Sequence, residues 1–371
     1  MEQVCTRCVM SSKGDPLIQF DEKGVCNYCK NAFAMMEKEY FPYEEGKKRL
    51  EKMLEEIKQK GKDSKYDCIM GISGGLDSSY LLYLGSKWDL RILAVHINDG
   101  FDTKISTNNI KKLVKASKCD YVEVTPDAKQ YANINKAYLH AGVPNIAIPQ
   151  DNILFAELHS LMRKYGVTCF LSGANYSLES ILQKGNTHNA YDLNQIKDIF
   201  KKFGSGSIDK LKFMSTIDLL KDQYILKYVT LRPLDFIDYT RQNAFKELNE
   251  FCGFEYYGRK HLENIFTAFV QLYWLPKKFN VDKRKSHLSS MIISNQLTRD
   301  EALHEMEEPI YNEQLMTEYI KIIKQKLDIS DAEFDQIMNS PTHTHEEFKQ
   351  EIDTFNYKAH KVLWKILKGL R

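Results

Sequence analysis

The sequence predicts an α/β protein with a doubly wound parallel sheet, a cysteine-rich N-terminal unit and a helical C-terminal region. Apolar strand-like runs alternate with helix-like segments after the first sixty residues, which is typical of a parallel sheet covered by helices. Two C-x-x-C pairs open the chain, and its last third has a helical, aromatic pattern. We expect boundaries at 1–42 for the cysteine-rich unit, 43–250 for the sheet domain and 251–371 for the helical region, which we expect to bind substrate or a partner.

The N-terminal unit carries four cysteines at a spacing that suits tetrahedral Zn²⁺. They are Cys5, Cys8, Cys26 and Cys29. Turn-forming residues between the pairs fit a zinc ribbon. Two disulfides or a redox pair are alternatives, but no apolar signal sequence precedes Cys5, so an oxidising compartment is not expected. An iron–sulfur cluster stays open as a second metal reading. We expect structural Zn²⁺, because a closed four-cysteine site leaves no position for a substrate.

The most informative segment is the loop Ser73–Ser79, Ser-Gly-Gly-Leu-Asp-Ser-Ser, here called the phosphate loop. It follows the strand-like run 66–72 and opens the helix-like run 79–84. Gly74 and Gly75 let backbone N–H groups approach an anion, at a helix N-terminus whose dipole favours negative charge. We therefore expect a nucleotide site here, with phosphates bound by Ser73, Gly74, Gly75, Ser78 and Ser79.

Asp77 lies inside this loop, where a carboxylate repels phosphate unless it caps the helix or binds Mg²⁺. The segment is not a Walker loop, because no Gly-Lys-Ser/Thr follows. It resembles the pyrophosphatase-loop (PP-loop) motif SGGxDS of enzymes that split ATP into AMP and pyrophosphate, such as GMP, NAD and argininosuccinate synthetases and tRNA thiolation enzymes. An ordinary glycine-rich turn is the alternative. The resemblance implies ATP and says nothing of the second substrate.

Other strand-like runs place further residues near this loop. Ligands of a parallel α/β sheet bind beyond the carboxyl ends of the strands. The runs 91–97 and 168–171 therefore bring His96 to Asp99 and the segment 172–179 toward the same crevice. We expect Gly173 beside the nucleotide, and Asn175 and Glu179 either on the acceptor substrate or Mg²⁺, or in an ordinary turn. His96 is expected to pack at a strand end rather than to catalyse.

In the helical region, the aromatic residues of 266–274 are expected to form core. Arg284 and His287 are one helical turn apart and are candidates to clamp a pyrophosphate, with a solvated charged face as the alternative. The stretch 300–371 has the pattern of charged amphipathic helices and suggests packing or partner docking.

Composition narrows the functional classes. The chain has 371 residues, 43% hydrophobic content and a net charge of +2, which predicts no general nucleic-acid surface. No apolar run reaches about 18 residues, so no membrane span is expected and the expected location is the cytoplasm. The isolated cysteines sit in no nucleophile elbow and Glu2 follows Met1, so no glutaminase site is visible. We expect another protein to supply any ammonia.

The cysteine pairs, the phosphate loop, the segment 171–175 and the run 283–289 together resemble the N-acetyl sugar amidotransferases of surface-polysaccharide biosynthesis, including lipopolysaccharide (LPS), over nearly the whole chain. That family converts an acetamido group of a sugar or nucleotide sugar to an acetamidino group, and a separate glutaminase, sometimes with a cyclase-like subunit, supplies ammonia. The resemblance implies adenylylation of the amide oxygen. It assigns catalytic roles to Asp77, Arg284 and His287.

Two other functions remain open. A tRNA-thiolating enzyme would share the ATP loop, but many carry Lys where this chain has Leu76, and no interior C-x-x-C pair is present. A zinc-ribbon scaffold with a degenerate nucleotide site is the non-enzymatic alternative.

Overall fold

A computed structural model describes residues 2–258 and 262–354 and contains one five-stranded sheet. The strand order is β3-β2-β1-β4-β5, and every neighbouring pair is parallel. The strands are β1 (Cys68–Gly71), β2 (Ile92–Ile97), β3 (Asp120–Val124), β4 (Cys169–Leu171) and β5 (Val229–Leu231). The predicted parallel α/β architecture is confirmed.

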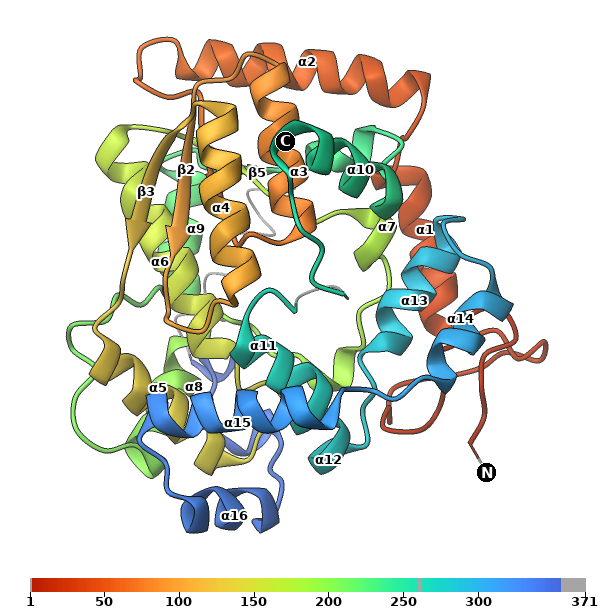
Figure 1. Cartoon of the computed structure of the whole chain (residues 1–371), viewed down its shortest axis with the longest axis vertical. Helices are drawn as coiled ribbons and strands as arrows, with labels where there is room; N and C mark the ends of the chain where they lie inside the picture. Colours follow the sequence, from red (N-terminus) through yellow and green to blue (C-terminus); the bar gives the residue numbers. More distant parts are fainter. Residues whose placement is uncertain (1, 259–261, 355–371) are drawn as a thin grey trace.

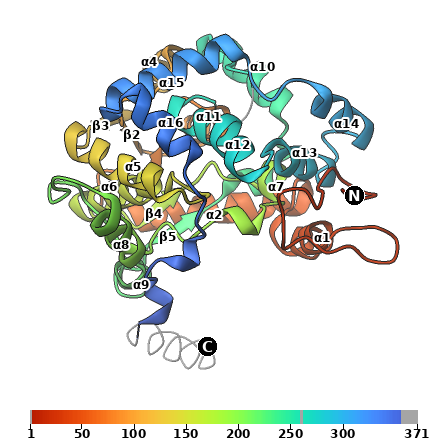
Figure 2. The same cartoon turned by 90° about the horizontal axis from the view of Figure 1, so that it is seen from below.

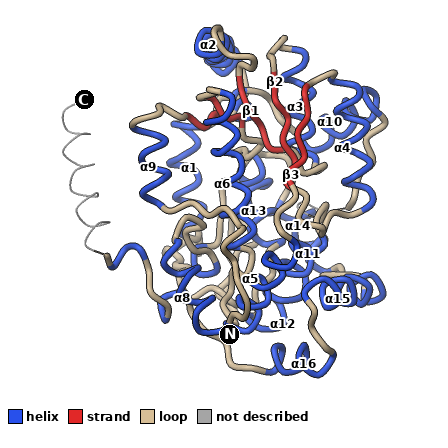
Figure 3. Tube along the Cα trace, turned by 90° about the vertical axis from the view of Figure 1, so that its left-hand side faces the viewer, coloured by secondary structure: helices blue, strands red, loops and turns tan. Residues whose placement is uncertain are grey.

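Helices cover both faces of the sheet, as Figure 3 shows. Side chains of β1 alternate between the faces: Cys68 and Met70 pack against the layer of α3, α4 and α10, whereas Ile69 packs against α6. The α2 helix joins the first layer through Ile57. These helices are α2 (Glu44–Gly61), α3 (Leu76–Lys87), α4 (Lys104–Ser117), α6 (Ile148–Tyr165) and α10 (Arg241–Cys252).

A second core lies below the sheet in Figure 1, where α5, α8 and α15 pack around a continuous aromatic helix. That helix runs from α11 through a π-helical turn, η3, into α12, and its Trp274 is fully buried. The elements are α5 (Ala128–Ala141), α8 (Leu193–Phe203), α11 (Ile265–Phe269), η3 (Val270–Trp274), α12 (Leu275–Phe279), α15 (Glu313–Leu327) and α16 (Asp331–Asn339). The predicted helical C-terminal region is confirmed.

The N-terminal unit packs against a different part of this region. In Figures 1 and 2, α13 lies next to α1, and α14 packs on α13. The short α7 packs on α13 and links the unit to the sheet. The remaining elements are α1 (Asn27–Glu39), α7 (Tyr176–Glu179), α9 (Thr216–Tyr224), α13 (Arg284–Ile293), α14 (Arg299–Glu307), η1 (Lys184–Asn186), η2 (Pro233–Phe236), η4 (His345–Glu347) and η5 (Glu351–Asp353).

Among the described helices, none combines the length and the apolar character needed to cross a bilayer.

Candidate functional site

The phosphate loop lies where the strand order reverses. Strands β2 and β3 extend to one side of β1, and β4 and β5 to the other, so the loops after β1 and β4 meet at the switch point. The two loops are in close contact, because a Cβ on Gly173 would lie only 3.0 Å from the backbone nitrogen of Ser78. The structure thus brings Gly173 beside the phosphate loop.

The backbone of the phosphate loop requires its glycines. Gly74 has φ +73°, and a Cβ there would lie 2.4 Å from the carbonyl oxygen of Ser106. Gly75 is the N-cap of α3 without a capping side chain. The first-turn N–H groups of a helix have no intrahelical acceptor, and the Leu76 N–H instead reaches the Tyr257 hydroxyl (2.8 Å). The helix dipole favours an anion at this end.

The loop serines are linked mainly to one another. Ser73 Oγ accepts from the Gly75 N–H (3.2 Å) and lies 3.4 Å from Ser78 Oγ. Ser79 is fully buried, and its hydroxyl has no partner among the described residues. Ser73 is the loop residue that lines the adjacent cavity.

Asp77 is held by a buried tyrosine. The Tyr239 hydroxyl donates a short hydrogen bond to Asp77 Oδ1. Burial, together with this carboxylate, raises the pKa of Tyr239 well above its usual value, so Tyr239 remains a donor. This contact gives Asp77 a part in loop geometry.

A cavity of about 540 Å³, here called the main cavity, opens at the switch point. It is lined by the ends of β1, β2 and β4, by the first turns of α6, and by the helix that contains η3. A π-helical turn is rare and often marks a functional site, and its Val270 and Gln271 face this cavity. The polar lining residues include Ser73, His96, Asp99, Asp102, Tyr131, Asn145, Gln150, Asp151, Ser172, Asn186, Thr187, Glu263, Asn264, Thr267, Gln271 and Lys283.

Glu263 connects the C-terminal region to the phosphate loop. Ser73 Oγ donates to Glu263 Oε1 (3.1 Å), and a Cβ on Gly75 would lie 2.6 Å from the same oxygen. Glu263 is only 8% exposed, and Oε2 has no hydrogen-bond partner in the described part of the chain. A buried carboxylate oxygen without a donor is costly, which makes Glu263 a candidate for a bound cation.

Three further acids lie along the cavity in different environments. His96 Nδ1 donates to the Ile72 carbonyl (2.9 Å), and its Nε2 lies 2.8 Å from Asp102 Oδ2. Burial opposes protonation of His96, but the Asp102 carboxylate outweighs it and the pKa of His96 is raised. Burial raises the pKa of Asp99, and it raises that of Asp151 to about 6. The sequence reasoning missed Asp102, Asp151 and Glu263.

The basic run 283–285 turns a different side chain toward the cavity from the one expected. Lys283 lines the cavity, and its ammonium group has no hydrogen bond or ion pair with the described residues. Burial lowers the pKa of Lys283, while the carboxylate of Glu179 acts to raise it. Arg284 instead binds Asp282 (2.7 Å) and the backbone carbonyl of Glu308 (2.9 Å). The structure does not place Arg284 in the cavity lining.

The other expected residues near α7 and α13 are also outside the cavity lining. Asn175 caps α7, accepting from the Leu178 N–H (3.0 Å) and donating to the Gly173 carbonyl (3.1 Å). This turn role is the alternative that the sequence left open. Glu179 ends α7, and His287 is half-buried on α13.

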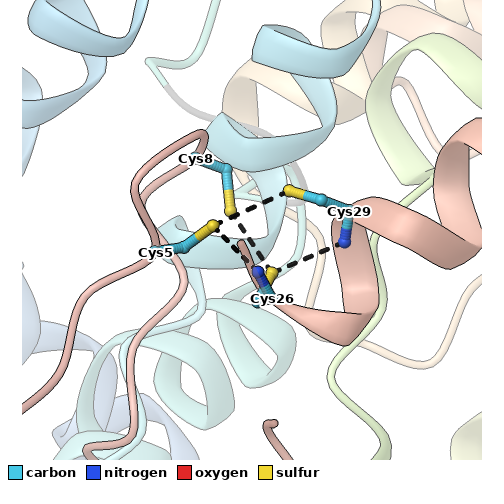
Figure 4. A group of neighbouring side chains, drawn as sticks. All are labelled: Cys5, Cys8, Cys26 and Cys29. Carbon is cyan, nitrogen blue, oxygen red and sulfur yellow. Dashed lines mark hydrogen bonds between the residues drawn. The ribbon is translucent and has the colours of Figure 1, made fainter. Parts of the chain in front are cut away.

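The four N-terminal cysteines form one cluster, drawn in Figure 4. All four are buried, and their Sγ atoms lie within 4.8 Å of one another. The Cys8–Cys26 and Cys5–Cys29 sulfur distances of 3.7 and 4.0 Å match the roughly 3.8 Å expected for tetrahedral Zn–S bonds of about 2.3 Å. Backbone N–H groups reach these sulfurs, including Cys26 N to Cys5 Sγ at 3.2 Å, as suits thiolates. The donor set and geometry are compatible with a zinc ribbon.

A parallel α/β sheet with a glycine loop and a polar cavity at its switch point defines the class of open α/β proteins whose ligands bind in the crevice at that point. The C-terminal region adds a more specific similarity. Residues 263–364 match the family of the "LPS biosynthesis protein WbpG-like, C-terminal domain", the last ten of them beyond the described residues. The expected relationship to proteins of surface-polysaccharide biosynthesis is confirmed at this level.

Comparisons with whole proteins give weaker similarities. Uncharacterized protein MJ1599 of Methanocaldococcus jannaschii is 31% identical over 125 residues, which cover 33% of this chain and 43% of that protein. The chain thus spans less than half of this relative. Among solved structures, NMN synthetase from Francisella tularensis has a TM-score of 0.36 at 12% identity, over 72% of this chain and 98% of its own. NH3-dependent NAD synthetase from Campylobacter jejuni has a TM-score of 0.34 at 16% identity, over 72% and 99%. At these scores the similarity supports no statement about function.

Proposed function

We propose that this protein is an ATP-dependent amidotransferase of LPS or related surface-glycan biosynthesis that converts a sugar acetamido group to an acetamidino group. One observation carries the proposal. The WbpG-like match begins at Glu263, and that side chain accepts a hydrogen bond from Ser73 of the phosphate loop. The region related to LPS biosynthesis and the expected ATP loop therefore line the same cavity, which is what a joint substrate site requires.

The proposed chemistry overcomes a poor leaving group. The acetamido oxygen attacks the α-phosphorus of ATP, a P–O bond breaks, and pyrophosphate leaves. The resulting O-adenylyl imidate has an electrophilic carbon. Ammonia attacks that carbon, the C–O bond to AMP breaks, and AMP leaves. Three of the four N–H protons brought by the amide and ammonia stay on the amidinium product, and the fourth is released to solvent. Holding the two substrates in one cavity supplies much of the rate, because it replaces a bimolecular encounter with a positioned one.

The position of each residue around the cavity indicates its proposed role. The N–H groups of the phosphate loop and the Ser73 hydroxyl bind phosphate at the start of α3. Lys283 replaces Arg284 in our proposal as the cation that stabilises charge on the leaving pyrophosphate, since it lines the cavity. We keep two further roles in the proposal, for residues on the packed helices α7 and α13. His287 would help to bind the pyrophosphate, and Glu179 would contact the acceptor substrate or Mg²⁺.

The acids near the loop also fit Mg²⁺, a hard cation that prefers oxygen ligands. Glu263 Oε2 has no partner within the described residues, and Asp77 lies in the first turn of α3. These two carboxylates would hold the ion, with Asp77 also fixing the loop through Tyr239. When bound, Mg²⁺ supplies charge neutralisation at the polyphosphate.

We further propose that ammonia comes from a separate glutaminase. The four-cysteine cluster would hold Zn²⁺ as a structural ion. The tRNA thiolation alternative gains no support from the cavity, because no cysteine is among its described lining residues. Cys68 and Cys169 are instead buried in β1 and β4. A non-catalytic scaffold does not account for the lysine and acids that line a cavity beside the loop.

The deciding experiment is mass spectrometry of acetamido nucleotide sugars and free acetamido sugars incubated with protein, Mg-ATP and ammonium, while AMP and pyrophosphate are followed. We expect an ATP-dependent loss of about one mass unit, from replacement of O by NH, with one AMP per product. Cleavage of ATP that requires tRNA and a sulfur donor would replace this proposal with thiolation. No cleavage with any acceptor would support the scaffold.

A further inference from the structure

Asp151 is an acid of the main cavity to which the preceding mechanism gives no role. It lies in the first turn of α6, and its backbone N–H is bonded to the Ala147 carbonyl (3.1 Å). Its carboxylate lines the cavity and makes no hydrogen bond or ion pair with any residue in 2–258 or 262–354. Its side chain is therefore available to a ligand.

The neighbouring acids are engaged. Asp99 Oδ2 accepts from Gln150 Nε2 (2.6 Å) and from the Tyr131 hydroxyl (3.1 Å). Asp102 is paired with His96. All three acids line the same cavity, but only Asp151 lacks a partner among the described residues.

A short chain of contacts joins Asp151 to the phosphate loop. Ser73 binds Glu263, and the next residue, Asn264, donates from Nδ2 to Asp99 Oδ1 (3.2 Å). Asp99 in turn holds Gln150, which precedes Asp151 in the chain. Ser73 and Asp151 both line this one cavity, so a sugar held in it faces both the phosphate loop and the Asp151 carboxylate.

The electrostatics of this wall favour a cationic group. Asp99, Asp102, Asp151 and Glu263 line the cavity, against the cations Lys283 and, when protonated, His96. Tyr131 from α5 and Tyr191 before α8 lie close enough to Asp151 to be affected by its charge. Burial raises the pKa of both, so they stay neutral at pH 7 and add no charge to this wall. A carboxylate removed from water gains most from a partner of opposite charge.

We propose that Asp151 binds the amidinium cation formed in the reaction. The inference rests on the proposed amidotransfer. An amidinium is planar and presents N–H donors in one plane, so a carboxylate can accept from both nitrogens, as it does from a guanidinium. The neutral acetamido group offers one N–H and no charge. The interaction with Asp151 therefore strengthens as ammonia adds and AMP leaves, which is the requirement for catalysis by differential binding.

The test begins with ligand binding, which does not depend on turnover. Acetamidinium chloride is titrated into the full chain with AMP present and followed by saturation-transfer NMR. We expect Asp151→Asn to weaken acetamidinium binding at least tenfold and leave acetamide, the neutral analogue, unchanged. Glu157→Gln is the matched control, since Glu157 is also on α6 but pairs with Lys212 outside the cavity lining (2.7 Å). Binding should strengthen as pH rises through about 6, because the ionised carboxylate binds the cation.

An ammonium titration separates the product cation from the reactant. Equal loss of ammonium and acetamidinium affinity in Asp151→Asn would overturn the proposal in favour of an ammonium site. Unchanged acetamidinium binding would also overturn it.

Turnover then separates this inference from the proposed function. Asp151→Asn should lower kcat for amidine formation while the KM for ATP stays within twofold. If wild-type protein forms amidine and the variant forms it equally fast, the inference fails and the proposed function stands. If wild-type protein forms no amidine, the proposed function fails, and the inference fails with it.

Discussion

The four-cysteine cluster and the main cavity differ in whether their polar groups have partners. The cluster is assembled within 25 residues, and its four sulfurs face one another in a closed shell. The cavity collects segments from Gly71 to Lys283 and leaves Asp151, Lys283 and one oxygen of Glu263 without partners among the described residues. A closed set of ligands predicts a structural role, whereas unpaired groups in a cavity predict a substrate. The following experiments break one region and leave the other intact.

Breaking the cluster should have the largest effect on stability. Cys29→Ser removes one of the four sulfurs, and we expect loss of bound zinc and a fall of several kcal/mol in the free energy of unfolding, since structural zinc contributes directly to folding. Zinc content by mass spectrometry and urea unfolding measure both. Cys252→Ser is the control, because Cys252 lies on α10 outside the cluster. Full stability without metal would assign the cluster another role.

Breaking the phosphate loop should greatly slow ATP cleavage while the fold persists. Gly74→Ala places a Cβ 2.4 Å from the Ser106 carbonyl at a positive φ, so the loop must move. We expect ATP cleavage to fall about a hundredfold or more, as a displacement of about 1 Å is enough to do. Gly253→Ala is matched, with φ +68° but no atom within 4 Å of the new Cβ. Pyrophosphate release that stays normal in Gly74→Ala would remove the loop from the site.

Removing the cavity lysine should have a smaller effect. Lys283→Met keeps much of the side-chain volume and removes the charge, and we expect kcat/KM for ATP to fall about thirtyfold, somewhat less than the roughly hundredfold or more lost with one oxyanion-stabilising donor. Lys285→Met tests the position, because Lys285 binds Glu2 (2.9 Å) near the N-terminus. If Lys285→Met is as damaging as Lys283→Met, the effect belongs to the charge of the run and not to the cavity.

The smallest effect concerns pH and a histidine behind the cavity wall. His345 Nε2 accepts from the N–H of Asn145, which lines the cavity (3.2 Å). Burial and nearby His188 lower the pKa of His345 to about 3, against about 6.5 when unfolded. Because the folded pKa is the lower one, neutral His345 does not oppose folding above pH 6.5. Below pH 6.5 the unfolded chain binds a proton that the folded protein does not, so the free energy of unfolding falls by up to about 1.4 kcal/mol per pH unit.

Urea unfolding from pH 7 to 5 measures the slope. His345→Gln should flatten it, whereas His304→Gln, at an exposed position, should not. Equal slopes in wild type and His345→Gln would contradict the assignment.

Local patterns were enough to predict the alternation of strands and helices, the glycine loop and the paired cysteines, because each of these is visible within a short stretch of sequence. Helix α4 begins at Lys104, since Thr103 caps it by accepting from the Ser106 N–H. The residue of the run 283–285 that lines the cavity is one position before the expected Arg284. A step of one residue turns a helix by about 100°, so Lys283 lines the cavity while Arg284 reaches Asp282.

The facing wall of the cavity could not be predicted in the same way. Ser73 and Glu263 are 190 residues apart, and no local pattern joins them. Asp151 follows Pro149 at the start of α6, where an acid ordinarily favours the helix dipole, so its sequence context suggests only helix stability. Its lack of a partner becomes visible only once α5, α6 and α11 are assembled.

The π-helical turn η3 also fixes how the residues before it are rotated about the helix axis relative to the residues after it. It holds one residue more per hydrogen-bonded loop than the α-helices on either side, so deleting one residue from it would restore a regular helix and rotate all that precedes it by about 100° relative to all that follows. Glu263 and Lys283 lie on opposite sides of this turn. A one-residue deletion here would leave composition and hydrophobicity almost unchanged, yet it would uncouple the contact to Ser73 from the cavity lysine.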